Sequence, residues 1–471
     1  MDMPADTPLS DLKPTLERLR AAHLAHTPDY RQRCDDLKRL RGLFKAQLPA
    51  MVDALQADFG LRSRHESLLS DGFTVLAEID HQLKHLRAWM RPSHRPTHWL
   101  FWPGRSEVRY QPLGVVGVIA PWNYPVNLAL MPLVAAIAAG NHVYLKPSEH
   151  TPRTSHWLRE LLAQAFPGER VAVALGGADV AQAFASLPFD HLFFTGSTAV
   201  GRKVMAAAAQ NLTPVTLELG GKSPCIIADG YPLATAAERI ASGKWLNAGQ
   251  TCIAPDYILL PRARRDAFID ALKQAVQQRY PQLGDDYTRI INPGQYGRLQ
   301  GYLDDARQRG CDVIPLAPLD PARAAAERII APTLVLEPGD DARIMQDEIF
   351  GPILPIKSYD RLDDALRYIN THDRPLALYH FDLDRRRTEQ VLDATIAGGV
   401  TVNDCVLHIA QEGLPFGGVG PSGMGHYHGH EGFLTFSKQK AVYYQSRFSS
   451  LALFKPPYGK LADWLVRFLT R

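Results

Sequence analysis

Cys252 lies in the segment NAGQTCIAP, residues 247–255, and its thiol is a candidate nucleophile. Most lone cysteines only pack in a core, so the thiol by itself does not establish a reaction. The other cysteines form neither a C-x-x-C pair nor a zinc-binding spacing, and they stand at positions 34, 225, 311 and 405. The neighbouring motifs therefore decide between a core residue and a nucleophile.

Three further motifs carry polar side chains after predicted strands or beside glycines: PWNYP at 121–125, KPSE at 146–149 and LELGGKSP at 217–224. Each polar residue has a simple structural explanation. Asn123 suits a turn, Lys146 could be a solvated strand end, and Glu218 could accept N–H groups from the glycines after it. Taken one at a time, these residues indicate no chemistry.

The stretch HLFFTGSTAVGRKV, residues 191–204, reads as a strand, a glycine turn and a helix. This order directs backbone N–H groups and the positive end of a helix toward an anion such as a phosphate. The spacing of Gly196 and Gly201 is not the G-x-G-x-x-G fingerprint, and Ser197 could cap the helix without any ligand. A plain strand-to-helix turn explains this segment equally well.

The motifs become specific when they are taken in order with EIFGPILP (348–355) and PFGGVGPSGMG (415–425). From Tyr30 to Tyr444 the chain resembles the aldehyde dehydrogenase superfamily. The segment after residue 406 resembles the class-three and fatty-aldehyde branch, which includes bacterial coniferyl aldehyde dehydrogenases. HGHEGF departs from that branch, which usually carries a lysine near His430, and only local surface details depend on that position.

The resemblance gives each residue a role in aldehyde oxidation. Cys252 would attack the carbonyl carbon, and the Asn123 amide with the Cys252 backbone N–H would stabilise the oxyanion. Glu218 would act as general base toward the water that hydrolyses the thioester, a task that suits a buried carboxylate with a raised pKa. A free thiol is only about 3% thiolate at neutral pH, and a helix end or a cationic nicotinamide would raise that fraction.

The resemblance also implies NAD as cofactor, with NADP possible. Lys146 and Glu149 would lie at the adenosine ribose, Ser197 near a phosphate, Glu348 at the nicotinamide ribose and Phe350 close to the nicotinamide. The complete expected set of cofactor-binding residues is Trp122, Lys146, Glu149, Gly196, Ser197, Gly201, Glu348 and Phe350. No metal is expected, and we interpret His426, His428 and His430 as residues of a solvated loop.

Two α/β lobes must position these residues, because short apolar runs alternate with helical stretches from Val108 and again from Pro232. The apolar spacing within residues 10–93 predicts that this segment is mostly helical. The expected fold is an α/β aldehyde dehydrogenase-like fold with a Rossmann-like cofactor lobe, a catalytic lobe and a small β oligomerisation arm. The expected boundaries are 1–102 and 122–228 for the cofactor-binding domain, 229–425 for the catalytic domain, 103–121 and 426–446 for the arm, and 447–471 for a C-terminal amphipathic tail.

The tail carries an apolar stripe at helical spacing, formed by Leu461, Trp464, Leu465, Phe468 and Leu469. Such a helix is too short to cross a bilayer. We expect it to pack near the active-site mouth of its own or a partner subunit, where it would favour bulky aldehydes. Attachment to a lipid surface is the less favoured alternative.

Composition narrows the classes of partner. The 52 basic and 49 acidic residues nearly balance, which predicts no nucleic-acid partner. No signal peptide is expected in MDMPADTPLS, and there is no unbroken run of about 18 apolar residues. We therefore expect a cytoplasmic protein without a spanning helix, and the resemblance to aldehyde dehydrogenases implies a homodimer.

The predicted function is NAD(P)-dependent oxidation of an aromatic aldehyde, such as coniferyl aldehyde, or of a medium-chain or long-chain aliphatic aldehyde to the acid. The reaction would pass through a cysteine thiohemiacetal and a thioester. A fatty aldehyde dehydrogenase at a membrane surface and a non-catalytic cofactor-binding protein on the same fold are the alternatives. Acyl transfer to coenzyme A is disfavoured, because branches with that chemistry usually lack the glutamate base that is present here as Glu218.

Overall fold

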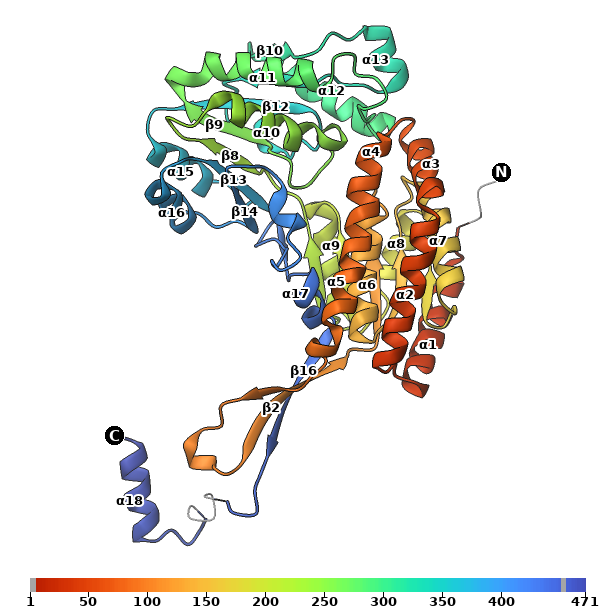
Figure 1. The fold of residues 1–471 in the computed structure, drawn as a ribbon, viewed down its shortest axis with the longest axis vertical. Coiled ribbons are helices and arrows are strands. Elements are labelled where there is room, and N and C mark those ends of the chain that lie inside the picture. The colour runs from red at the N-terminus through yellow and green to blue at the C-terminus, as the bar shows by residue number, and fades with distance from the viewer. Residues whose placement is uncertain (1–5, 450–454) are drawn as a thin grey trace.

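The chain was described with a computed structural model, which covers residues 6–449 and 455–471. Two short segments lie outside the described residues. Residues 1–5 belong to the segment in which no signal peptide is expected, and residues 450–454 belong to the predicted tail. Two lobes stand side by side, and an arm projects away from both (Figure 1). None of the helices in the described ranges has the length and apolar character needed to span a membrane.

The N-terminal part is helical, as its apolar spacing predicts. Its elements are α1 (Leu9–Ala25), α2 (Tyr30–Ala46), α3 (Leu48–Phe59), α4 (Arg64–Ser67), η1 (Leu68–Phe73) and α5 (Thr74–Trp89). Pro49 lies in the first turn of α3, where a missing N–H costs no hydrogen bond. The Asp29 side chain caps α2 by accepting a hydrogen bond from Gln32 N at 2.9 Å.

A six-stranded sheet forms the centre of the first lobe, in the order β15-β7-β6-β3-β4-β5. Its strands are β3 (Val115–Ile119), β4 (His142–Lys146), β5 (Val171–Val173), β6 (His191–Thr195), β7 (Val215–Glu218) and β15 (Gly423–Met424). All are parallel except β15. The chain order reverses at β3, which pairs with β4 on one side and β6 on the other. In such sheets a ligand-binding crevice forms at this reversal, outside the carboxyl ends of the strands.

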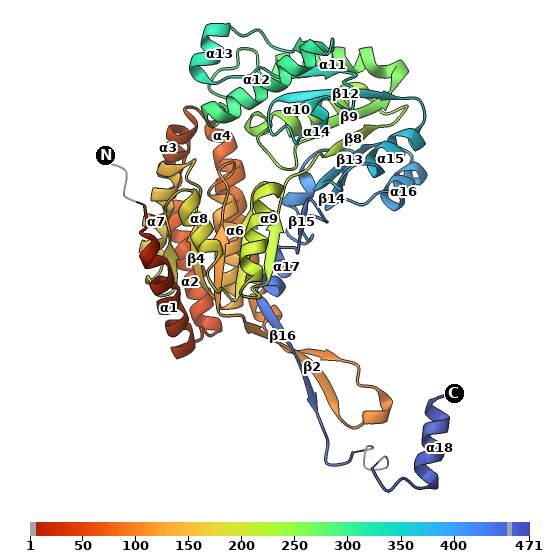
Figure 2. The ribbon, with the colours of Figure 1, turned by 180° about the vertical axis from the view of Figure 1, so that it is seen from behind.

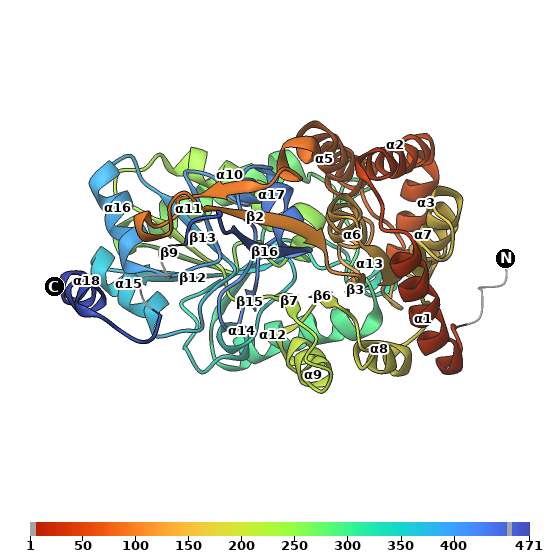
Figure 3. The ribbon, with the colours of Figure 1, turned by 90° about the horizontal axis from the view of Figure 1, so that it is seen from below.

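Helices cover both faces of this sheet. The connecting helices are α6 (Asn127–Ala139), α7 (Pro152–Ala165), α8 (Ala178–Ala185) and α9 (Thr198–Ala209). Core residues of α2, α3, α5, α6 and α7 pack on one face, and those of α1, α8 and α9 pack on the other (Figure 3). Gly140 ends α6 with φ 95°, as a C-cap glycine does.

The second lobe is built on a seven-stranded sheet in the order β10-β11-β12-β9-β8-β13-β14. Its strands are β8 (Pro224–Ile227), β9 (Tyr257–Pro261), β10 (Asp312–Pro315), β11 (Thr333–Leu336), β12 (Ile353–Tyr359), β13 (Ala377–Phe381) and β14 (Gly399–Val402). Its helices are α10 (Leu233–Trp245), η3 (Leu246–Gly249), η4 (Arg262–Arg264), α11 (Arg265–Arg279), α12 (Pro293–Gln308), α13 (Pro321–Glu327), α14 (Arg343–Gln346), α15 (Leu362–Asn370), α16 (Arg385–Ala394) and η5 (Leu407–Ala410). Only β10 is antiparallel to its neighbour.

The arm is a three-stranded antiparallel sheet of β1 (Ser93–Arg95), β2 (Arg105–Pro112) and β16 (Ser437–Tyr444). β2 and β16 lie within the two segments that the sequence places in the arm, and these two strands pair along their whole length, from Pro112 opposite Ser437 to Arg105 opposite Tyr444. η2 (Trp99–Phe101) lies in the loop between β1 and β2. In the view from below, β2 and β16 of the arm lie in front of the lobes (Figure 3).

The strand pairings differ from the expected boundaries at several places. β3 lies within 103–121 but is a buried strand of the first lobe, and β8 lies within 122–228 but belongs to the second sheet. β15, within 229–425, pairs with β7, whereas β1, within 1–102, pairs with β2. α17 (Gly429–Thr435), within 426–446, packs on α5 and α6. Apolar periodicity identifies a strand, but only pairing identifies its sheet.

The predicted tail forms the helix α18 (Lys460–Leu469), but this helix does not lie near the lobes of its own chain. It lies beyond the end of the arm, away from both lobes of its own chain (Figures 1 and 2). Leu461, Trp464 and Phe468 of the stripe are each more than half exposed. In this structure the tail therefore does not pack over the active-site mouth of its own chain, and packing on a partner subunit stays a prediction.

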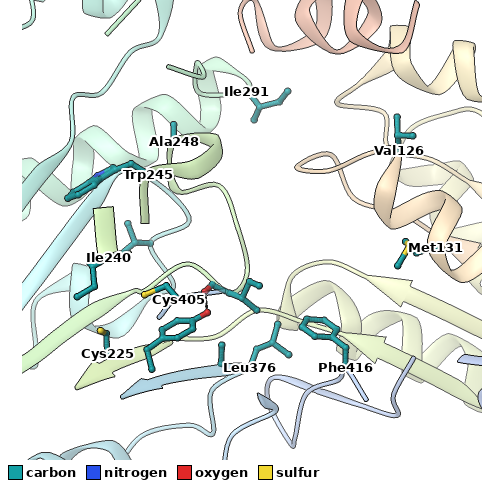
Figure 4. Packing of buried hydrophobic residues seen from close by; sticks show 14 of the residues in the cluster. Val126, Met131, Cys225, Ile240, Trp245, Ala248, Ile291, Leu376, Cys405 and Phe416 are labelled. Carbon is teal, nitrogen blue, oxygen red and sulfur yellow. Dashed lines mark hydrogen bonds between the residues drawn. The ribbon is translucent and has the colours of Figure 1, made fainter. Parts of the chain in front are cut away.

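The two lobes share one continuous core. Val126 and Met131 come from the first lobe, and Ile240, Trp245 and Leu376 come from the second (Figure 4). Trp245 is fully buried and its indole N–H donates to Pro352 O at 3.0 Å. This shared core fixes the edges at which the sheets face each other.

Candidate active site

The carboxyl edge of the first sheet faces the amino edge of the second. Glu218 ends β7, and the chain then passes through Gly220 into β8. A Cβ at Gly220 would lie 1.9 Å from the Glu348 carboxylate, so only glycine permits this approach. The loops before β8, β9 and β12 thus meet the loops after β3, β6 and β7.

The loop that carries Cys252 is held in an unusual shape. Asn247, Ala248 and Gly249 all have positive φ, of 52°, 51° and 73°. The Gln250 side chain holds the loop from within, because Nε2 donates to Asn247 O at 3.0 Å and Oε1 accepts from Ile291 N at 3.0 Å. Three successive left-handed residues are costly, and such strain is typical of functional loops.

Asn123 reaches this loop from the other lobe. Its side-chain Nδ2 donates to Gln250 O at 3.2 Å, and its backbone O accepts from Asn247 Nδ2 at 3.0 Å. The next residue, Tyr124, shares a 2.6 Å hydrogen bond with Thr251, the neighbour of Cys252. Asn123 is buried, so an ordinary solvated turn does not describe it.

A buried ion pair supports the Asn123 turn from below. Arg62 and Asp71 are both fully buried, with Nη2 and Oδ2 2.9 Å apart. Asp71 Oδ1 accepts from Val126 N and Asn127 N at 3.1 and 2.9 Å, which caps α6. The Arg62 guanidinium lies 5.1 Å from the centre of the Tyr124 ring. The sequence carries no signal for this pair, because Arg62 lies in a loop and Asp71 in η1, and neither segment has a recognisable motif.

Glu218 is buried at the end of β7, and no described residue forms a hydrogen bond with either carboxylate oxygen. The alternative that the following glycines donate to it is therefore wrong. Burial raises the pKa of Glu218 well above its usual value, because removal of water disfavours the charged form. A carboxyl group in this setting can accept a proton near neutral pH.

Cys252 lies in an acidic environment. Burial, followed by the charges of Glu348 and Glu218, raises the pKa of the Cys252 thiol to about 12. Burial and Asp256 raise the pKa of Glu348 to about 8. The thiol is therefore neutral at pH 7. Because Cys252, Glu348 and Glu218 are acidic groups with raised pKa values, a cationic neighbour would favour the charged form of each.

Two lysines of the second lobe lie near the site but were not among the residues predicted from the sequence. Lys222, in the LELGGKSP motif, donates to Asp256 Oδ2 at 2.5 Å and to Asp347 O at 2.9 Å. Lys244, eight positions before Cys252, is fully buried, and its Nζ has no hydrogen-bond partner among the described residues. Burial lowers the pKa of Lys244 to about 8. The sequence gives little signal for Lys244, because α10 also carries Glu238 and Arg239 and only the packing shows which of these charged residues is buried.

The residues expected at the adenosine ribose form a pair at the end of β4. Lys146 is buried, and its Nζ donates to Glu149 Oε2 at 2.8 Å. Burial raises the pKa of Glu149, but the hydrogen bond and charge of Lys146 outweigh it and leave that pKa below normal. Glu149 is thus an exposed carboxylate at neutral pH, and Lys146 is not a solvated strand end.

Gly196, Ser197 and Gly201 form the turn from β6 into α9. Ser197 Oγ accepts from Val200 N at 3.4 Å, so this serine does cap the helix. A Cβ at Gly201 would lie 2.6 Å from Leu219, which shows that this glycine lets α9 approach β7. The turn lies beside the reversal at β3, where backbone N–H groups of α9 point out of the sheet edge.

Trp122 and Phe350 meet across the two lobes. Their rings pack edge to face with centroids 5.3 Å apart. Phe350 has φ 48°, a strained value for an aromatic residue. The pair joins the loop after β3 to the loop before β12 and forms an apolar wall beside the Cys252 loop.

The three histidines after PSGMG have different environments. His426 is exposed in a loop, as predicted, whereas His430 is exposed but lies in helix α17, where it packs on Trp89 at 5.2 Å. His428 is buried and stacks on Phe416 at 5.3 Å, so the solvated-loop interpretation is wrong for it. Burial lowers the pKa of His428 to about 3, which keeps it neutral.

Comparison with known proteins agrees with this geometry. The aldehyde dehydrogenase family model matches residues 20–442. A probable coniferyl aldehyde dehydrogenase from Pseudomonas aeruginosa is 52% identical over 461 residues, which cover 97% of this chain and 96% of that protein. Among solved structures, the substrate-bound state of AldH from Staphylococcus aureus is 38% identical with a TM-score of 0.92 and covers 97% of this chain and 99% of its own.

A solved indole-3-acetaldehyde dehydrogenase in complex with NAD+ is 25% identical, with a TM-score of 0.85, and covers 94% of this chain and 90% of its own. The expected α/β aldehyde dehydrogenase fold is therefore confirmed. Because the family match spans most of its length, this chain belongs to the aldehyde dehydrogenase family and oxidises an aldehyde to the carboxylic acid with NAD or NADP.

Proposed function

We propose that Cys252 is the nucleophile, that Asn123 and the Cys252 backbone N–H stabilise the oxyanion, and that Glu218 is the general base. The observation that carries this proposal is the meeting of all three residues at the junction of the lobes. Asn123 touches the Cys252 loop at Gln250, and the charges of Glu218 and Cys252 act on each other. Each oxyanion donor contributes about 3 kcal/mol to lowering the barrier.

The cofactor would bind across the reversal at β3. Its phosphates would lie at Gly196, Ser197 and the start of α9, because the first N–H groups of a helix have no partner within the helix and attract an anion. Lys146 and Glu149 would hold the adenosine ribose, and Glu348, whose Oε1 has no described partner, would hold the nicotinamide ribose. When bound, the nicotinamide supplies the hydride acceptor and a positive charge. Gly201, Trp122 and Phe350 would shape the site.

The second half of the reaction belongs to Glu218. The acyl group remains on Cys252 as a thioester, and a water must attack its carbonyl carbon. Glu218 takes a proton from that water, the C–S bond breaks, and the sulfur leaves as the Cys252 thiolate. The raised pKa of Glu218 matches this task, because a stronger base accepts the proton more readily.

We further propose that the substrate is an aromatic aldehyde such as coniferyl aldehyde, or a medium-chain or long-chain aliphatic one. The name of the Pseudomonas aeruginosa relative supports the aromatic class. The test is a spectrophotometric panel of coniferyl aldehyde, benzaldehyde, octanal and acetaldehyde. We expect kcat/KM for the aromatic aldehydes to exceed that for acetaldehyde by at least about tenfold, since burial of an aromatic ring contributes about 1.5–3 kcal/mol. A preference for acetaldehyde would contradict this substrate class.

The same panel tests the tail. We propose that the arm joins two subunits in a cytoplasmic homodimer and that α18 covers apolar surface near the partner's active-site mouth. The exposed stripe on α18 and the exposed Trp99 and Trp102 in the arm support this, because such surface is normally covered. A chain that ends at residue 446 should lose affinity for the bulky aldehydes. Unchanged affinity together with lost binding to lipid vesicles would instead support a membrane-surface enzyme.

We expect a modest preference for NAD over NADP. The Glu149 carboxylate would accept hydrogen bonds from ribose hydroxyls but repel a 2′-phosphate, while Lys146, His150 and Arg153 offset part of the repulsion. Glu149→Gln should reduce the ratio of kcat/KM for NAD over NADP by about tenfold. Glu160→Gln, an exposed glutamate on α7, is the control. A strong NADP preference in the unmodified enzyme would refute the assignment of Glu149.

A further inference from the structure

One face of β6 and β7 carries an unusual set of polar groups. Side chains two positions apart on a strand share a face, so Phe193 and Thr195 lie on the same face of β6, and Thr216 and Glu218 on the same face of β7. In the register Phe193 is opposite Thr216 and Thr195 is opposite Glu218, which places all four on one surface. The residues on the other face, Leu192, Phe194 and Leu217 among them, belong to a separate apolar core.

Tyr427 covers this surface from the segment after β15. Its ring packs edge to face on Phe193 with centroids 4.9 Å apart, and its backbone N donates to Phe416 O at 2.8 Å. Gly425, two residues earlier, approaches so closely that a Cβ would lie 3.0 Å from Thr216. Tyr427 is therefore held against the face of the sheet that also carries Thr195 and Glu218.

The polar atoms gathered here lack partners. Within residues 6–449 and 455–471, nothing forms a hydrogen bond with the Tyr427 hydroxyl, the Thr195 hydroxyl or either Glu218 oxygen, although all are buried. Buried polar groups are almost always satisfied, so these groups take partners during the reaction that the protein does not otherwise supply. Burial raises the pKa of the Tyr427 hydroxyl well above normal, and the charges of Glu218 and Cys252 raise it further, so this hydroxyl keeps its proton at neutral pH.

We propose that the Tyr427 hydroxyl is a positioning group for the base Glu218: it donates a hydrogen bond to the Glu218 carboxylate, directly or through the hydrolytic water, with Thr195 as a second partner of that water. This inference rests on the proposed role of Glu218. The hydroxyl keeps its own proton. The water gives one proton to Glu218 and its oxygen to the acyl carbon, and the electron pair of the C–S bond leaves on the Cys252 sulfur.

The groups that face Glu218 determine the sign of the pH effect. Cys252 faces it from the loop before β9, Tyr427 from the segment after β15, and Glu348, from the loop before β12, faces Cys252. Glu78 on α5 and neutral His428 lie beside Tyr427. A hydrogen bond from Tyr427 favours the charged carboxylate and lowers the pKa of Glu218. Its removal should raise that pKa, so hydrolysis would need a higher pH.

The experiment is stopped-flow measurement of reduced cofactor with Tyr427→Phe. We expect an intact first burst, a following steady rate about tenfold slower at neutral pH, and an acid limb of the steady rate moved up by about one pH unit. Thr195→Val should lower the steady rate by a smaller factor and leave the burst intact. Tyr144→Phe is the matched control, because it removes a buried hydroxyl from β4 in the other core of the same sheet.

Three outcomes would overturn the inference. One is a steady rate and pH profile of Tyr427→Phe equal to those of the unmodified enzyme. Another is an equal loss of burst and steady rate, which would show a purely structural role. The third is normal turnover of Glu218→Gln, which would overturn the proposed base itself and so is distinguishable from a failure of Tyr427 alone.

Discussion

Replacement of Cys252 by alanine is expected to lower aldehyde oxidation by a factor of about 10⁴ or more, since the proposed mechanism needs the Cys252 sulfur for the covalent adduct. NAD binding should persist, because the residues proposed to hold the adenosine ribose and the phosphates lie on β4, β6 and α9, away from the thiol. Steady-state kinetics gives the first quantity, and calorimetric titration with NAD gives the second.

Cys311→Ala is the matched control for Cys252. Cys311 is also a partly buried free cysteine, but it lies next to β10 in the second lobe, outside the site. It should retain normal turnover. If Cys252→Ala also kept near-normal turnover, the covalent mechanism would be wrong and the sulfur would be only a core group.

The state of the thiol gives a further check on this mechanism. With its pKa raised to about 12, the thiol without cofactor should react slowly with iodoacetamide at pH 7. Bound NAD should accelerate alkylation, because a cationic ring favours the thiolate. Mass spectrometry of the alkylated peptide identifies Cys252 as the site.

Glu218→Gln is expected to lower steady-state turnover by about 10²–10⁴-fold while it preserves the first burst of reduced cofactor. The amide has the shape of the carboxyl group but cannot accept the proton of the hydrolytic water. Acylation of Cys252 needs no such base, so the acyl enzyme should accumulate. Stopped-flow absorbance measures the burst, and intact-protein mass spectrometry detects the acyl group.

Glu107→Gln in the arm, a buried glutamate remote from the lobe junction, is the control for Glu218. A variant of Glu218 that shows neither a burst nor a trapped thioester would move this residue to the first half of the reaction. Glu218 would then activate the Cys252 thiol rather than the water.

Much of the fold follows from local sequence. The buried strands β3, β4 and β6 are short and mostly apolar, and the helices between them have amphipathic or wholly apolar spacing, so the type and order of these elements can be predicted. Pro49 and Gly140 mark helix ends for stereochemical reasons that hold in any fold. The family motifs then place Cys252, Asn123 and Glu218 in one reaction, because each residue type suits one step.

Sheet membership, buried pairs and protonation depend on contacts between residues far apart in the chain, so only the tertiary structure shows them. The membership of β8 and β15 in their sheets comes from pairing, which short apolar runs do not encode. The buried Arg62–Asp71 pair and the approach of Tyr427 to the face of Glu218 join residues far apart in the chain, without a local pattern. Residue type sets what a group can do, whereas burial and neighbours set its protonation. The sequence alone therefore indicates a thiol and a carboxylate at the site, and only the packed structure shows both with strongly raised pKa values.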